Sequence, residues 1–212
     1  DENTNTIFGP TSKRILGSDR LREELCGLSF QIAPTSFFQV NPWQAENIYR
    51  RVEQIAGKSV AGDVAWDLYC GTGQISMLLA QSGFRTLGIE VNPQAIRDAQ
   101  KNVVTNDISP APHYVAGAVE EIQGSFPSWA EKPELIVVNP SRKGLSDSVR
   151  DYLKGVLKDN PKVRLVYVSC EMETLARDVE DLTSDTEHSM KQLEAFDMFP
   201  YTEKLEWLAV LN

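Results

Sequence analysis

The sequence predicts an α/β fold in which helices cover both faces of a mostly parallel sheet. From Asp63 onward, short apolar runs alternate with stretches of helical periodicity. The runs are apolar throughout, which is typical of strands buried on both faces of a parallel sheet. Parallel neighbours require crossover connections, and helices lie between the runs, so the order predicts a doubly wound sheet.

Each element follows from its own pattern. The predicted parallel strands are the apolar runs 64–69, 86–90, 134–138 and 163–168. The predicted crossover helices are the stretches 75–80, 93–104 and 149–157. A closing apolar run at 205–211 predicts a final strand, which we expect to be antiparallel to the others.

The N-terminal part has a different pattern. Residues 1–13 are polar and predict a loose lead-in, and the apolar stretches 14–16 and 28–32 flank a charged segment that we interpret as the turn of a hairpin. Pro42 then begins a predicted helix that ends at Gly57. We therefore place a boundary after residue 35.

Composition excludes several classes of protein. The 212 residues carry a net charge of −9, and 42% are apolar, as in ordinary globular domains. No stretch predicts a membrane span or an export signal. The acidic balance disfavours a large nucleic-acid footprint, although a local basic patch is compatible with it. We expect a monomer.

The cysteines and histidines predict no metal site. Cys26, Cys70 and Cys170 form no C-x-x-C pair, and the two histidines are far apart in sequence. An odd number of cysteines without framework spacing favours reduced thiols and a cytoplasmic location. The chain does not begin with Met, so we expect a piece of a longer protein.

A glycine-rich loop follows the first parallel strand. Gly71 and Gly73 allow close approach of a ligand at the carboxyl end of the strand, and Glu90 closes the next strand, where a carboxylate could accept hydrogen bonds from ribose hydroxyls. Ser76 stands where a dinucleotide-binding motif has its third glycine. The pattern favours S-adenosylmethionine over NAD; the alternative is a plain turn and a surface glutamate.

Two later strands end in further candidates at the same sheet edge. Asn139 could present its amide to a cofactor or a planar base, or belong to an ordinary turn. Cys170 lies just before a predicted helix, whose N-terminus lowers a thiol pKa and favours a nucleophilic thiolate. Cys70 is the competing cysteine, and an inert buried thiol is the commoner role for either one.

Six ordered blocks together resemble the S-adenosylmethionine-dependent RNA uracil-C5 methyltransferases. The resemblance covers about residues 36–211 and rests on Ser36–Asn41, Asp67–Gln74, Gly88–Glu90, Asn139–Gly144, Tyr167–Asp178 and Phe199–Glu206.

The resemblance implies a Rossmann-like class I methyltransferase fold. It implies a catalytic domain at 36–212 and, at 1–35, the remnant of an upstream domain. It also implies a tRNA or rRNA substrate, Cys170 as nucleophile and Glu206 as base. The cofactor residues implied by the resemblance and the loop are Gln39, Tyr69, Gly71, Gln74, Glu90 and Asn139.

Departures from the family pattern leave alternatives open. The family usually has Asp where this chain has Asn139, which predicts weaker affinity for a cationic sulfonium. Glu171 beside Cys170 is expected to raise the thiol pKa. The alternatives are a catalytically impaired cofactor-binding module and an amino-group methyltransferase. An amino-group methyltransferase would need an aromatic residue where Arg142 stands, and it would not need a cysteine.

Overall fold

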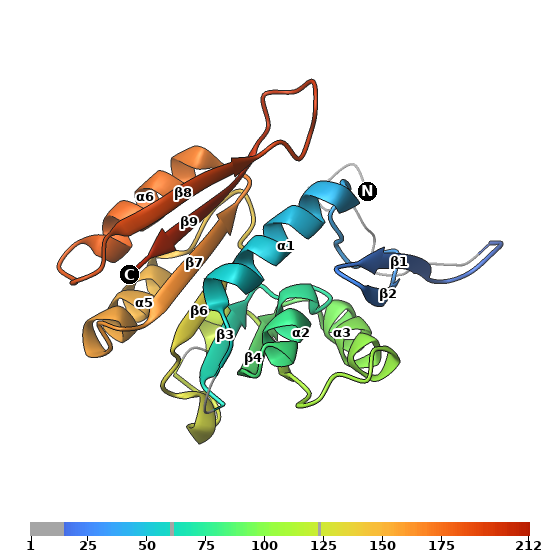
Figure 1. Ribbon diagram of the computed structural model, residues 1–212, viewed down its shortest axis with the longest axis horizontal. Helices are drawn as coiled ribbons and strands as arrows, with labels where there is room; N and C mark the ends of the chain where they lie inside the picture. Colours follow the sequence, from blue (N-terminus) through green and yellow to red (C-terminus); the bar gives the residue numbers. More distant parts are fainter. Residues whose placement is uncertain (1–14, 60–61, 123) are drawn as a thin grey trace.

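The computed structural model describes residues 15–59, 62–122 and 124–212, and its centre is a seven-stranded sheet (Figure 1). The strand order is β5-β4-β3-β6-β7-β9-β8. The first five are parallel, and β9 is antiparallel to both β7 and β8. The bounds are β3 Val64–Leu68, β4 Arg85–Glu90, β5 His113–Ala116, β6 Leu135–Val138, β7 Arg164–Ser169, β8 Met190–Phe196 and β9 Glu206–Leu211.

Helices cover both faces of this sheet. The helical bounds are α1 Pro42–Ala56, α2 Gln74–Gln81, α3 Pro93–Thr105, α4 Val119–Ile122, a 3-10 turn Ser128–Ala130, α5 Asp147–Asp159 and α6 Met172–Thr183. One buried cluster joins α1 and α2 to one face of the sheet, and a second joins α5 and α6 to the other. The predicted doubly wound fold with an antiparallel strand near the C-terminus is confirmed.

The sequence pattern missed the two edge strands of the sheet. β5 is only four residues long, and β8 is mostly exposed. Edge strands bury less surface than central ones, so neither carries the long apolar run that marks the interior strands.

The hairpin forms, but the prediction of its first strand was wrong. β1 is Leu21–Leu25 and β2 is Leu28–Ile32, so the charged segment read as a turn is itself a strand. The turn is Cys26-Gly27, with φ of 55° and 75°; positive φ at both residues is what the type I′ two-residue hairpin loop requires. Ile15 and Leu16 are exposed outside the hairpin, and the predicted lead-in lies outside the described residues.

Side chains of α3 hold the hairpin against the domain. The N–H groups of Ser29, Gln31 and Ala33 donate to side-chain oxygens of Asn106, Asn102 and Asp98, each at 2.8 Å. These acceptors lie four residues apart along one face of α3, with Asn106 as the residue that caps its C-terminal end. Leu25, Leu28, Phe30 and Ile32 of the hairpin also join the buried cluster beneath α1 and α2.

Candidate active site

The glycine-rich loop turns sharply between β3 and α2. Tyr69, Gly71 and Gly73 all have positive φ, and the Cys70 N–H donates to the carbonyl of Ile89. A side chain at Gly73 would collide with the Tyr114 hydroxyl and lie 3.0 Å from the Ala99 Cβ. Glycine is therefore required at position 73 for both its backbone conformation and the space around it.

Glu90 connects this loop to the segment after β4. One carboxylate oxygen accepts the Gly71 N–H at 3.1 Å, and the other accepts the Asn92 N–H at 2.8 Å. The side chain is half-buried, and each oxygen keeps a further lone pair for a ligand. This arrangement fits a ligand with neighbouring hydroxyls, as the ribose of S-adenosylmethionine has.

A buried acid, Asp67, lies beneath the loop, and the sequence reasoning gave it no role of its own although it begins one of the family-like blocks. Asp67 is fully buried in β3, and one of its oxygens accepts the Ser76 hydroxyl at 2.5 Å. Its other oxygen has no partner among the described residues, and burial raises its pKa to about 7. Ser76, which stands in place of a third glycine, thus anchors this carboxyl. The signal was an acid inside an otherwise apolar strand.

The other predicted cofactor residues lie at different places around the loop. Asn139 follows β6, and its N–H donates to the carbonyl of Leu68 at 3.2 Å, beside the loop. Gln39 is half-buried in the segment before α1, which Thr35 connects to Asn92 through a hydrogen bond. Gln74 is buried and lines a small void beneath the hairpin. Their roles stay predictions.

Cys170 and Glu206 lie opposite one another at the ends of β7 and β9. The antiparallel register pairs Ser169 with Trp207, so Cys170 and Glu206 occupy the next pair of positions. The turn carrying Cys170 is fixed by the Ser169 hydroxyl, which donates to the Glu171 carbonyl at 2.9 Å and accepts the Glu171 N–H at 3.1 Å. The fold thus places a thiol and a carboxyl side by side.

Burial controls the ionisation of both groups. It raises the pKa of Glu206, which is 3% exposed, to about 7. Burial, and then the charge of Glu206, raise the pKa of the Cys170 thiol, and the Arg142 guanidinium opposes them. Of the two opposing influences expected at Cys170, a lowering by the helix N-terminus and a raising by a carboxylate, the raising influences are the larger. The carboxylate that raises the thiol pKa is thus that of Glu206 and not the neighbouring Glu171, whose side chain lies 3.7 Å from the Lys204 ammonium.

The sequence reasoning did not assign a role to Arg142. Its positive charge lowers the pKa of the Cys170 thiol. The loop after β6 therefore supplies the cation that opposes the effects of burial and of Glu206 on this thiol. The signal available was the position of Arg142 in the block Asn139–Gly144, at the same sheet edge as Cys170.

Neither a membrane-spanning helix nor a metal-binding cluster is found in the described part of the chain. Within it, no helix combines the length and apolar character needed to cross a bilayer. Across residues 15–59, 62–122 and 124–212, no three or more His, Cys, Asp or Glu side chains are placed to hold a metal ion.

Comparison with known proteins identifies the family. The family described as tRNA (uracil-5-)-methyltransferase matches residues 11–126 and 129–212, which is most of the chain. The chain belongs to this family. A relative from Oceanobacillus iheyensis, called an uncharacterized RNA methyltransferase, is 39% identical over all of this chain and 45% of its own length. One from Enterococcus faecalis is 36% identical over 99% of this chain and 44% of its own length.

Solved structures agree with the family assignment. A Pyrococcus abyssi tRNA (uracil-54, C5)-methyltransferase in complex with S-adenosyl-L-homocysteine has a TM-score of 0.76 and 31% identity, covering 93% of this chain and 45% of that one. A tRNA m1G37 methyltransferase from M. jannaschii, with a TM-score of 0.66 and 12% identity over 94% of this chain and 59% of its own, shares the fold. The cofactor is S-adenosylmethionine. The chain spans about half the length of these family members.

Proposed function

We propose that this domain methylates C5 of a uridine in tRNA or rRNA through a covalent bond between Cys170 and C6 of the base. The observation that carries the proposal is the pairing of Cys170 with Glu206 at the ends of β7 and β9. Family membership and the Glu90 contact with the glycine-rich loop support it.

Cys170 supplies the nucleophile that the substrate requires. Uracil C5 is too weakly nucleophilic to take a methyl group unaided. The Cys170 thiolate adds to C6, and the electron pair of the C5=C6 bond moves to give an enolate that is nucleophilic at C5. Bound S-adenosylmethionine would supply an electrophilic methyl group: C5 would take it as its bond to sulfur breaks, with S-adenosylhomocysteine as the leaving group.

Glu206 completes the reaction. Its carboxylate removes the proton from C5, the C5=C6 double bond re-forms, the C6–S bond breaks, and Cys170 leaves as thiolate. A base with a pKa of about 7 is well suited to this step, because it is substantially ionised at neutral pH and still accepts a proton.

The cofactor residues fall into two groups in this proposal. Glu90 binds the ribose, and Tyr69 and Gly71 of the loop lie beside it. Asn139 lies beside the loop at the end of β6, where an amide replaces the acid usual in the family and weakens the attraction for the sulfonium. Gln39 and Gln74 complete the set that the family resemblance implies.

We extend the proposal to the whole protein. Relatives are about twice as long as this chain, so we assign part of the RNA binding to a region of the protein outside it. Residues 1–35 would then connect that region to the catalytic domain. We also propose that the protein is a monomer and that it acts in the cytoplasm.

The test is capture of the covalent intermediate. With 5-fluorouridine-substituted RNA and S-adenosylmethionine, C5 carries no removable proton, so the parent domain should stay bonded to RNA on a denaturing gel. Cys170→Ala should give no adduct, and Cys70→Ala, the matched control, should behave as the parent. An adduct that survives Cys170→Ala would overturn the proposal.

Turnover should also depend on pH in a defined direction. Raised pKa values of Glu206 and Cys170 mean that both active forms, carboxylate and thiolate, are gained as pH rises. Single-turnover methylation should therefore increase from pH 6 through pH 8. In Glu206→Gln, adducts with unfluorinated RNA should accumulate, since proton removal is slowed. A rate that falls over this range contradicts the roles given to both groups.

A further inference from the structure

The segment that carries Arg142 has no regular structure and is held by α6. The Thr174 hydroxyl donates to the Arg142 carbonyl at 3.2 Å, and the Arg177 guanidinium donates to the carbonyls of Lys143 and Leu145 at 3.0 and 3.2 Å. The Leu145 N–H donates to Asp178 at 2.7 Å. The Leu145 carbonyl also accepts from the Arg150 guanidinium of α5 at 2.8 Å. Backbone groups from 142 to 145 therefore bind mainly side chains of α6, with one further contact from α5.

These three side chains lie together on α6. Residues 174, 177 and 178 are spaced i, i+3 and i+4, so they share one helical face. Gly144 lies directly against them: a Cβ there would be 2.5 Å from an Asp178 oxygen and 2.8 Å from the Arg177 guanidinium. With φ of +71°, Gly144 allows the loop to approach this face closely.

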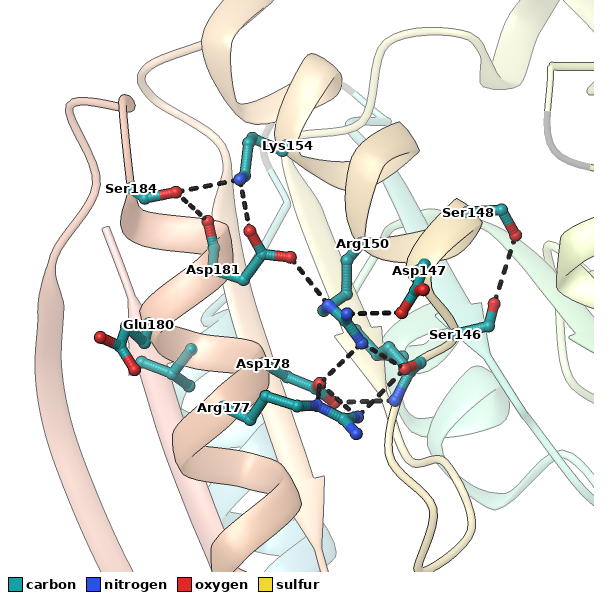
Figure 2. Close-up of polar contacts among 12 residues, drawn as sticks. Ser146, Asp147, Ser148, Arg150, Lys154, Arg177, Asp178, Glu180, Asp181 and Ser184 are labelled. Carbon is teal, nitrogen blue, oxygen red and sulfur yellow. Dashed lines mark hydrogen bonds and ion pairs between the residues drawn. The ribbon is translucent and has the colours of Figure 1, made fainter.

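Asp178 connects the same face to the rest of the site. It is fully buried and accepts the Tyr167 hydroxyl of β7 at 2.7 Å. Figure 2 shows Arg150 of α5 and Arg177 converging on it, at 3.3 and 2.7 Å. The other carboxylates that bind Arg150 are those of Asp147 and Asp181. The loop, α5, α6 and the strand that leads to Cys170 thus share one charged network.

We propose that the α6 face formed by Thr174, Arg177 and Asp178 positions Arg142 beside Cys170. The same helix begins two residues after Cys170, so one rigid element fixes both the thiol and the loop opposite it. These are positioning residues, because they act through the backbone of residues 142–145 and contact no reacting atom. The inference rests on the proposed role of Cys170.

A purely structural role would have a different signature. Weakening the network would then lower stability and leave the thiol unchanged. If the α6 face positions Arg142, weakening it moves a cation away from Cys170 while Glu206 stays, so the thiol becomes harder to ionise. The pH dependence of Cys170 reactivity separates the two roles.

The experiment measures iodoacetamide alkylation of Cys170 against pH in the full chain, with the site resolved by peptide mass spectrometry. The alkylation experiment needs neither RNA nor methyl donor. A negative result in it can therefore be distinguished from a failure to form the covalent adduct with RNA. The variants are Arg177→Gln and Thr174→Val, both at residues that are not fully buried. Lys154→Gln is the matched control, since Lys154 binds Asp181 and Ser184 in the same network and not the loop.

We expect both α6 variants to slow alkylation at neutral pH by about three-fold or more, as half a pKa unit changes the thiolate fraction by that factor. Lys154→Gln should match the parent. In an Arg142→Gln background, the α6 substitutions should have no further effect. Parent-like alkylation in both variants, or an undiminished effect without Arg142, would overturn the proposal. Thr174→Val removes no charge, but the Thr174 hydroxyl also lies 3.2 Å from the Glu171 carbonyl next to Cys170. Its slowing therefore supports the proposal only if it disappears in the Arg142→Gln background.

Discussion

Helices α3 and α6 each bind the backbone of a neighbouring segment, but they do so with different chemistry. On α3, Asp98, Asn102 and Asn106 accept three N–H groups from the hairpin. On α6, Thr174 and Arg177 donate to carbonyls of the loop after β6, while Asp178 accepts one N–H. The first attachment is largely neutral, and the second is ionic.

The segment being bound explains the difference. Alternate N–H groups along a strand are about 6.7 Å apart, and residues four apart on a helix rise about 6 Å, so one short side chain per turn can reach each group. The loop of 142–145 has no such repeat. It needs side chains of different reach and both donor and acceptor character, which Thr, Arg and Asp supply together. A strand can therefore be bound by similar short side chains at successive helical turns, whereas an irregular loop requires several kinds of side chain.

The largest expected difference follows from neutralising the acid on each helix. Asp178→Asn should lower the free energy of unfolding by about 3–5 kcal/mol, the range for removing one partner of a buried ion pair, because two guanidiniums and two neutral donors converge on it. Asp98→Asn should cost about 1 kcal/mol. Its close partners are neutral, and Arg20 is 3.7 Å away.

Urea denaturation of both variants measures this difference. The Tyr167→Phe variant is the control for Asp178, because it removes one neutral donor and no charge. Equal losses for Asp178→Asn and Asp98→Asn would show that the two attachments do not differ in ionic character.

Glycines in the two bound segments give a second comparison. Gly144→Ala should cost about 2–4 kcal/mol, from a left-handed backbone together with crowding against Asp178. Gly27→Ala, in the hairpin turn, has nearly the same φ and nothing within 4 Å of the added methyl. It should cost only the backbone strain, about 1–2 kcal/mol. Thermal unfolding of the pair would contradict this if Gly27→Ala proved the more damaging.

Removing the middle acceptor of α3 should loosen the hairpin, and also one 3.5 Å contact with the Thr72 carbonyl of the glycine-rich loop, but not the loop that α6 holds. Asn102→Ala leaves the Gln31 N–H without its partner, at a cost of about 1–3 kcal/mol. Hydrogen exchange should accelerate at the Gln31 amide and stay unchanged at the Leu145 amide, which α6 holds. Faster exchange at Leu145 as well would mean that the two attachments are coupled.

The smallest effect is expected at the solvent side of the ionic network. Asp147 binds Arg150 at 2.7 Å, but its side chain is 93% exposed. Asp147→Asn should therefore change the unfolding free energy by less than about 0.5 kcal/mol. A loss in urea denaturation as large as that of Asp178→Asn would show that the strength of the network does not follow burial.

The sequence predicts best those helices and strands whose buried faces are lined by apolar side chains along their whole length. The central strands and α1 to α3 lie against a core on defined faces, so their apolar patterns marked them. The strand Leu21–Leu25 was mistaken for a turn because its outward side chains are charged and only Leu25 is buried. β5 and β8 were missed for the same reason at the sheet edges.

The site divides in the same way. Strand ends in a parallel sheet meet at one edge, so Glu90, Asn139 and Cys170 could be expected there, although their roles remain predictions. The pairing of Asp67 with Ser76, and the approach of Arg142 to Cys170, depend on loop backbone and on side chains distant in sequence. No periodic pattern encodes such contacts.

The row of acceptors on α3 also bears on how the molecule behaves in a concentrated solution. A strand with unpaired N–H groups along its outer edge is a template for pairing with a strand of another molecule, and such pairing leads to aggregation. The outer N–H groups at 29 and 31 of β2, and that of Ala33 just after it, are already bound within the same chain. The β2 edge of the hairpin is thus closed to strand addition from another molecule, which, within the described residues, leaves β1 as the edge of this two-stranded sheet where a further strand could pair.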